Sequence, residues 1–452
     1  MRVCHSARQA AELDGSELVP ESVRRVAAHA ERPFVQSPEL STIQGASPES
    51  VLLRLLLHRM TALRVLCLAL ALLLGAVPLR GHDEHDVAQG GNVPIIDIAP
   101  LFWKSFPQFF HYDTIVEIRR ACIDVGFFYI KGMPVDSVNM ATLEAEAMYF
   151  FGKPEEEKRR IELKRAGKAW RGYFSVGEEL TSGVPDNKQG LYFGVDEDGV
   201  GKGPLRGRNQ YPERPYVDSA TGKEAMHLLF ERSVPLHLDM MRQIGQALMQ
   251  AVALSLDLPH DTLNRTFSTP TELFRIFSYP PPSESSDVAL GLGLGVGEHT
   301  DYGYLTILWQ DGQGGLQVRN ASTHDWIDVS PLEGTYVVNL GDALEHYTGG
   351  LFRATPHRVK RTPSSSPRLS MPYFFDPSFD APMTSVVDRL PPETLAIIQA
   401  RRRDQAQAAR WDAQDPTLWQ GTYGDYLQKK ISKVFPELFA SAGLKSPGGD
   451  EL

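Results

Sequence analysis

The chain has 452 residues, of which 42% are hydrophobic, so it can bury a large core, and its length suggests two or three structural units. Acidic residues outnumber basic residues by 56 to 46, and the net charge of -10 gives no general attraction to phosphate backbones or anionic membranes. We therefore expect no nucleic-acid partner.

The first 80 residues differ from the rest in composition. Residues 1–50 carry scattered polar residues and prolines without a hydrophobic period, so we expect a disordered extension. Residues 51–80 form an apolar leader whose unbroken run, Val65 to Val77, is too short to span a bilayer comfortably. From Met60 onward the leader has the basic start, apolar centre and small residues of a signal peptide.

Three other interpretations of the 51–80 segment stay open: an organelle presequence, a single membrane anchor, and a mis-assigned start codon. The protein is therefore expected to touch a membrane only through this segment, if the segment is retained. The sequence leaves cytoplasmic, organellar and secretory locations open.

An N-terminal α/β region is predicted over residues 92–200. Residues 92–100 contain a β-branched run closed by prolines, which predicts a first strand. Helical spacing follows over residues 114–125, and residues 126–132 predict a second strand. Within that helix, Cys122 has apolar neighbours, so we expect a small buried thiol and no disulfide framework.

The middle of the chain combines helices with a long irregular stretch. Residues 141–165 are helical in pattern, and Pro154 with its trailing glutamates suits a helix N-terminus. Residues 166–217 are rich in Gly, Pro and charge, which predicts mostly loop. Residues 225–258 predict a long supporting helix, because apolar residues repeat every four positions at Leu236, Met240, Ile244 and Leu248.

Residues 270–380 are a succession of short β-type runs separated by Gly and Pro. These runs cover residues 273–279, 305–310, 316–319, 336–340 and 368–375. Many short strands at such spacing predict a sandwich or barrel. Helical pattern returns over residues 390–440, so we expect a mainly β fold with C-terminal helices.

A candidate metal site lies in the β-rich part. His299 and Asp301 are two residues apart, which on a strand directs both side chains to the same face. Two histidines and one carboxylate bind the iron(II) of non-haem oxygenases and leave three positions open. His357 stands at the entrance to a later strand that can return beside the first pair.

An ordered series of motifs surrounds these residues. Glu298–Gly303 (EHTDYG) is followed by LTILWQD at 305–311, GGLQV at 314–318, VNLGD at 338–342, TPHRV at 355–359 and RLS at 368–370. The series resembles the isopenicillin N synthase-like 2-oxoglutarate/iron(II) dioxygenases. Matches upstream, at 93–97, 126–128, 171–173 and 185–188, extend the resemblance over roughly residues 92–440.

The resemblance implies a double-stranded β-helix (jelly-roll) core with iron(II) bound by His299, Asp301 and His357. It further implies that the far carboxylate of 2-oxoglutarate is held by Arg368, Ser370 and Tyr279. A guanidinium fork suits a carboxylate because it donates two parallel charge-assisted hydrogen bonds. For Tyr279 the alternative is a tyrosine of the core.

The chain departs from the family pattern in one place. Phe277 and Ser278 stand where many plant members have Asn and Tyr, so the polar contacts around 2-oxoglutarate are expected to differ. Asn339 and Asp342 resemble family residues that we assign to turn stabilisation.

The resemblance implies an oxidoreductase that uses O2 and 2-oxoglutarate to hydroxylate or otherwise oxidise a small organic substrate, with release of succinate and CO2. No catalytic residue is predicted beyond the metal centre. The substrate is not identified, although Tyr373, Phe375 and residues 166–217 are candidates for the pocket wall, with a core position as the alternative. Two other functions are considered: an iron oxidase of the same fold that does not consume 2-oxoglutarate, since such relatives keep an Arg-x-Ser pair, and a non-catalytic ligand-binding protein.

Overall fold

The computed structural model describes residues 93–103, 111–197, 204–217, 224–227, 229–281, 294–361, 364–405 and 416–441. The expectations for the 1–50 extension and the 51–80 leader lie outside these residues. Within the described ranges, no helix combines the length and the apolar character that crossing a membrane requires.

The larger of two main sheets has eight strands and is antiparallel except where β1 and β2 pair in parallel. Its order across the sheet is β1 (Ile95–Asp97), β2 (Phe127–Lys131), β14 (Tyr336–Leu340), β11 (Leu305–Gln310), β16 (Arg368–Ser378), β9 (Pro270–Tyr279), β6 (Gln189–Gly194) and β3 (Gly172–Phe174). Residues far apart in the sequence therefore meet on its central strands.

The smaller main sheet has four antiparallel strands, in the order β10 (Leu294–His299), β15 (His357–Lys360), β12 (Leu316–Arg319) and β13 (Trp326–Asp328). Two further pairs are β4 (Leu180–Thr181) with β5 (Val184–Pro185), and β7 (Arg214–Val217) with β8 (Glu224–His227). One cavity has residues of the central strands of the large sheet and of β10, β12 and β15 of the small sheet in its wall, so it lies between the two sheets.

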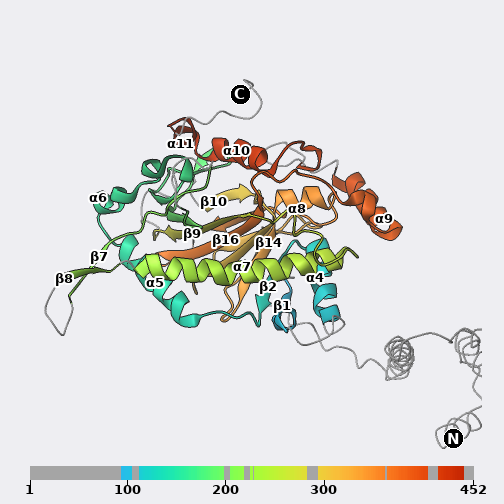
Figure 1. Cartoon of the computed structure of the whole chain (residues 1–452), viewed down its shortest axis with the longest axis horizontal. Coiled ribbons are helices and arrows are strands. Elements are labelled where there is room, and N and C mark those ends of the chain that lie inside the picture. Colours follow the sequence, from blue (N-terminus) through green and yellow to red (C-terminus); the bar gives the residue numbers. More distant parts are fainter. Residues whose placement is uncertain are drawn as a thin grey trace, which may run out of the picture. The chain divides into compact units, whose positions relative to one another are not determined.

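Helices flank this β structure. The α-helices are α4 (Tyr112–Asp124), α5 (Ser137–Phe151), α6 (Glu155–Lys158), α7 (Leu229–Ser255), α8 (Asp342–Tyr347), α9 (Pro392–Gln405), α10 (Tyr423–Val434) and α11 (Pro436–Ser441). Short 3-10 helices cover Ala99–Phe102, Arg159–Ile161, Leu163–Ala169, Val387–Arg389 and Pro416–Leu418. Figure 1 shows α7 crossing one side of the large sheet, while α10 and α11 lie on the other side.

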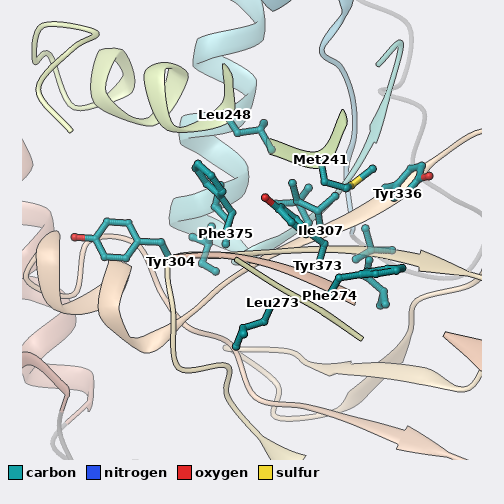
Figure 2. Packing of buried hydrophobic residues seen from close by; sticks show 14 of the residues in the cluster. Met241, Leu248, Leu273, Phe274, Tyr304, Ile307, Tyr336, Tyr373 and Phe375 are labelled. Carbon is teal, nitrogen blue, oxygen red and sulfur yellow. The ribbon is translucent and has the colours of Figure 1, made fainter. Parts of the chain in front are cut away.

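One part of the hydrophobic core lies between α7 and the large sheet. Figure 2 shows Met241 and Leu248 of α7 above Ile307, Tyr373 and Phe375 of the central strands. Each of these five side chains is at most 1% exposed. Burying an apolar side chain of this size stabilises the fold by about 1.5–3 kcal/mol.

The buried face of α7 differs in register from the prediction. Met240, Ile244 and Leu248 are buried, but Leu236 is 52% exposed, while Leu238 is buried. A strict four-residue repeat drifts around a helix that has 3.6 residues per turn, so it cannot follow one face for several turns.

The predicted strand at 126–132 and helix at 114–125 are confirmed as β2 and α4, and Cys122 is buried, with burial raising the pKa of its thiol. The helix predicted over 141–165 instead ends at Phe151, and a short new helix follows Pro154. Proline lacks the backbone N–H needed to continue a helix, which explains the break.

The prediction of mostly loop over 166–217 was wrong in part. This stretch supplies β3 and β6, which extend the large sheet, as well as β4, β5 and β7. Strand β6 carries two glycines, and Gly190 lies so close to Phe174 and Phe277 that a Cβ would stand within 2.9 Å of both rings. Glycine here reflects close packing of neighbouring strands and not a loop.

The contact between α7 and β16 gives a first testable prediction. A Cβ on Gly245 would lie 2.6 Å from the Phe375 ring. In an open helix, Gly→Ala stabilises by about 1 kcal/mol, whereas here we expect Gly245→Ala to destabilise by about 1–3 kcal/mol through overpacking. Urea unfolding measures this difference.

Gln246→Ala, at the exposed neighbouring position, serves as the control and should change stability by less than about 0.5 kcal/mol. Adding Phe375→Leu to Gly245→Ala should recover part of the loss. A more stable Gly245→Ala variant would contradict the packing described for this contact.

Candidate functional site

The cavity between the sheets has a volume of about 130 Å³. Its wall includes residues from the large sheet, the small sheet, the 166–217 stretch and α10. Residues 166–217 were expected to contribute to the pocket wall, and eight of them line this cavity: Trp170, Arg171, Glu179, Thr181, Lys188, Tyr192, Phe193 and Leu205. The cavity can hold only small molecules.

Pairing of β10 with β15 brings the three predicted metal ligands together. His299 ends β10 and lies opposite His357, the first residue of β15. Asp301 follows two residues after His299, and its Oδ1 lies 3.9 Å from Nε2 of His299 and 3.8 Å from Nε2 of His357. The three side chains offer ligand atoms within 4.8 Å of one another, and they form the one such group found among the described residues.

The backbone fixes both imidazole rings. Nδ1 of His299 lies 2.8 Å from the carbonyl oxygen of Gly297, and Nδ1 of His357 lies 3.1 Å from that of Thr355. A carbonyl only accepts, so each Nδ1 carries the proton and each Nε2 keeps a free lone pair. Burial lowers the pKa of both rings, to about 4 for His357, which favours the neutral form that binds metals.

One oxygen of Asp301 is already occupied. Its Oδ2 accepts a hydrogen bond from Thr306 Oγ1 and another, 2.7 Å long, from Asn339 Nδ2. Burial acts to raise the pKa of Asp301, but the two neighbouring histidines and these two donors lower it. The side chain is therefore a carboxylate with Oδ1 left for a metal.

Asn339 was thus misassigned to turn stabilisation, since its amide orients Asp301 from β14. The contact joins strands β14 and β11 to the ligand loop, and residues so far apart in sequence cannot be paired by inspection. Asp342 is buried at the start of α8 and connects α10 to α8, because Tyr426 donates its hydroxyl to Oδ2 at 2.7 Å and Lys430 Nζ lies 3.3 Å away.

The donor set fits iron(II). Two neutral imidazoles and one carboxylate on one side of a metal leave other positions open for a co-substrate and O2. The other polar atom of each side chain is held by the protein, which is the usual support of a metal site.

Arg368 and Ser370 lie two residues apart on β16 and so share one face of the strand, and Arg368 lies opposite Tyr279 of β9. Arg368 is 3% exposed; its Nε donates to the Gly314 carbonyl and its Nη2 to Gln310 Oε1 at 3.1 Å. Nη1 is buried and has no hydrogen-bond partner among the described residues.

An unsatisfied buried donor costs about 1–3 kcal/mol, so this guanidinium has capacity for an acceptor from a ligand. The Tyr279 ring lies 4.9 Å from Arg368 Cζ, and burial raises the pKa of the tyrosine, which keeps its hydroxyl protonated. Ser370 and Tyr279 both line the cavity. The three residues predicted for 2-oxoglutarate therefore lie on two paired strands of the large sheet, and Ser370 and Tyr279 line the same cavity as the metal ligands.

The expectation that Tyr373 and Phe375 line the pocket was wrong. Both side chains are fully buried on the opposite face of β16, against α7, where Tyr373 donates to Glu272 Oε2 at 2.7 Å (Figure 2). Because alternate residues of a strand point to opposite faces, Pro372 and Phe374 line the cavity instead.

The C-terminal helix α10 forms another part of the wall. Its cavity-lining residues are Tyr423, Leu427, Ile431 and Val434. Tyr423 donates its hydroxyl to Oδ2 of Asp376 at 2.6 Å, and the backbone N–H of Tyr304 donates to Oδ1 at 2.8 Å. Burial nevertheless raises the pKa of Asp376 to about 7.

Two family profiles match most of the folded chain. Residues 93–214 match the region described as non-haem dioxygenase in morphine synthesis N-terminal, and residues 270–377 match the 2OG-Fe(II) oxygenase superfamily. The first contains the cavity wall from 166–214 and the second contains all three candidate metal ligands.

Curated relatives are matched over nearly their whole length. A protein of Dictyostelium discoideum named as a probable iron/ascorbate oxidoreductase is 40% identical over 365 residues, which are 77% of this chain and 96% of the relative. A 1-aminocyclopropane-1-carboxylate oxidase of the same organism is 32% identical over 76% of this chain and 96% of its own. A homoarginine-6-hydroxylase of Glycine max is 34% identical over 77% of this chain and 98% of its own.

Among solved structures, a full-length protein of Neurospora crassa in complex with alpha-KG superposes with a TM-score of 0.60. The two chains are 24% identical over 76% of this chain and 98% of that one. This likeness confirms the predicted mainly β fold with a double-stranded β-helix core.

The raised pKa of Asp376 gives a second testable prediction. The carboxyl binds its proton more tightly in the folded chain than in the unfolded chain, so its contribution to stability is present below the unfolded pKa and is lost as pH rises through about 7. We expect the free energy of unfolding to fall by up to about 4 kcal/mol more in wild type than in Asp376→Asn across this window.

Urea unfolding of the chelator-treated protein at several pH values between about 4.5 and 8 measures the difference. Asp380→Asn, at an exposed position nearby, is the control and should follow wild type. Parallel curves for wild type and Asp376→Asn would show that the buried carboxyl does not titrate as described.

Proposed function

Because the chain belongs to the 2OG-Fe(II) oxygenase superfamily, we propose that His299, Asp301 and His357 hold its iron(II) and that it oxidises a small organic molecule with O2. The observation that carries this proposal is the state of the three ligands. Each has one atom free toward a common point, and its other polar atom is held by a hydrogen bond.

Iron(II) and 2-oxoglutarate, when bound, would supply a two-electron oxidation in which O2 is consumed and 2-oxoglutarate yields succinate and CO2; the second oxygen atom enters the substrate in hydroxylation and leaves as water in desaturation or ring closure. The protein's own residues orient the metal ligands and shield the site. The carbonyls of Gly297 and Thr355 hold the imidazole protons on Nδ1, and Asn339 keeps Oδ1 of Asp301 directed at the metal position. Asn339, Thr355 and His357 are buried, which limits the access of water to this side of the site.

We place the far carboxylate of 2-oxoglutarate against Arg368, Ser370 and Tyr279. The buried Nη1 of Arg368, which has no partner among the described residues, supports this placement, because an ionised acceptor satisfies it. The hydroxyls of Ser370 and Tyr279 line the same cavity and can donate to the same carboxylate.

A second candidate function is an iron oxidase that does not consume 2-oxoglutarate. The 32% identity to a relative named as 1-aminocyclopropane-1-carboxylate oxidase favours it, and the Arg-x-Ser pair does not separate the two. Succinate formed in a fixed ratio to product supports the oxygenase, whereas turnover without added 2-oxoglutarate supports the oxidase. A purely ligand-binding protein has no need of a complete donor set and is not favoured.

The net charge of -10 supports a small-molecule substrate and not a nucleic acid. The relatives named as homoarginine-6-hydroxylase and 1-aminocyclopropane-1-carboxylate oxidase also act on small molecules. We leave hydroxylation, desaturation and ring closure as chemical outcomes of the same site.

The third prediction tests 2-oxoglutarate binding. Anaerobic titration of the iron(II)-loaded protein with 2-oxoglutarate should produce a visible metal-to-ligand charge-transfer band, which reports chelation. Arg368→Ala should weaken 2-oxoglutarate binding by about 100-fold, since a buried hydrogen-bonded charge pair is lost.

Arg358→Ala is the matched control, because Arg358 lies on β15, stacks on Trp326 and does not line the cavity. This variant should give the wild-type titration. Iron binding without any band in wild type would move the assignment to the oxidase or to a binding protein.

The fourth prediction concerns Asn339. Asn339→Ala removes a hydrogen bond to Asp301 but no ligand, so iron(II) affinity should fall by about 10–100-fold while the fold is kept. Anaerobic competition with a chromophoric chelator measures the affinity. Asn264→Ala, at an exposed turn, is the control, and equal affinities of Asn339→Ala and wild type would contradict an orienting role.

A further inference from the structure

The cavity wall carries buried charges beyond those assigned to iron and 2-oxoglutarate. They include Glu179 and Lys188 from the 166–217 stretch, together with Asp186, which pairs with Lys188, and Arg275 from β9. Asp186 and Lys188 belong to the 185–188 motif, but no charged role was predicted for any of these four residues. Arg171, also in the wall, donates to the carbonyls of Ala169 and Leu205. Charged groups are seldom buried unless they are paired or bind something.

Three of these four charges satisfy one another. Lys188 forms ion pairs with Asp186 and, at 2.9 Å, with Glu179. Tyr192 donates its hydroxyl to Glu179 Oε1 at 3.0 Å, and Thr181 donates to Asp186 Oδ2 at 2.7 Å. The acidic groups of this wall are therefore already engaged.

Arg275 is different. Its guanidinium makes no hydrogen bond to any described residue, and the Nη1 atom lies 3.8 Å from Glu179 Oε1, too far for one. Its Nε is buried without a partner in the described part of the chain. The Cζ atom lies 4.2 Å from the Tyr192 ring centre and 4.8 Å from that of Phe374.

Two aromatic rings thus hold the guanidinium while its donors remain unused by the residues that the structure describes. The side chain is 18% exposed and lines the cavity, so the remaining donors are accessible from the cavity. Trp170 adds a second N–H donor to the same wall, because its indole Nε1 is buried and has no hydrogen-bond partner among the described residues. The backbone of Trp170 is left-handed, with a φ of 50°. A wall with spare donors and engaged acceptors fits a ligand that accepts hydrogen bonds.

The 2-oxoglutarate position does not account for Arg275. Arg368 lies opposite Tyr279, and Arg275 lies four residues earlier on the same face of β9. At about 3.3 Å per residue, the two arginines stand about 13 Å apart along the strand. The two guanidinium groups are therefore too far apart along the sheet to bind the same carboxylate.

We propose that Arg275 binds a carboxylate of the substrate in a bidentate pair, so that the substrates of this protein are small carboxylic acids. The inference rests on the proposed function, because it assumes that the cavity receives a substrate. The planar guanidinium held between Tyr192 and Phe374 is already oriented, so little further ordering is needed on binding. A neutral carbonyl, the alternative acceptor, would form a weaker hydrogen bond to the guanidinium than a carboxylate, because only the carboxylate is charged.

The fifth prediction tests this assignment on the holoenzyme with iron(II) and 2-oxoglutarate. A library of small metabolic carboxylic acids, each paired with its methyl ester, is screened for stimulation of succinate release. We expect acids to stimulate and their esters to be poor. Arg275→Gln should lower kcat/KM for the best acid by about 100-fold and remove the preference for acid over ester.

Two further variants keep the test independent of folding. Arg275→Lys keeps the positive charge but cannot donate two parallel hydrogen bonds to one carboxylate, so it should retain part of the preference for acid over ester. Phe374→Leu removes one ring beside the guanidinium and should raise KM for the acid about 3- to 30-fold. Arg358→Gln is the control for the loss of an arginine, and KM for 2-oxoglutarate should be unchanged in every variant.

The inference is overturned if esters stimulate as well as acids, if Arg275→Gln keeps the acid preference, or if no acid in the library stimulates succinate release. A failure of the proposed function looks different, because the charge-transfer band with 2-oxoglutarate would then be absent from wild type itself. With the band present in wild type and in Arg275→Gln, the acid-to-ester ratio alone decides.

Discussion

The alternation of side chains along β16 is the constraint on which both the core and the cavity depend. This strand is paired on both edges, with β11 and β9, so its two faces must be buried in two different environments. One face packs Tyr373 and Phe375 against α7, and the other carries Arg368 and presents Ser370 and Phe374 to the cavity. A slip of one residue would exchange the two sets and destroy both.

Within the site, hydrogen bonds decide which atoms remain available. The imidazoles give Nδ1 to the backbone, and Asp301 gives Oδ2 to Thr306 and Asn339. Arg368 gives two of its nitrogens to the protein and keeps one. The atoms available to a ligand are therefore those that the internal hydrogen bonds do not use. The same hydrogen bonds hold these side chains in place.

The sequence predicted the parts of the site that are local or follow a fixed order. His299 and Asp301 are two residues apart on one strand, and the order of later motifs pointed to His357 and Arg368. Arg368 and Ser370 were predicted to face the cavity, and strict alternation from them along one strand places residues 372 and 374 on that face, so the prediction of Tyr373 conflicted with a rule that the sequence already allowed.

Other features depend on contacts between distant segments. The bond from Asn339 to Asp301 crosses between strands, and the isolation of Arg275 is visible only when all its described neighbours are in place. Strand β6 was missed because its glycines, which allow close packing, look like loop residues in the sequence.

Helix α10 comes near the C-terminal end of the described chain. A ribosome-bound chain that ends before Tyr423 lacks the part of the cavity wall that α10 forms and the hydroxyl that donates to Asp376. Because chains emerge from the N-terminus onward, all three metal ligands are synthesised before the helix that completes this wall.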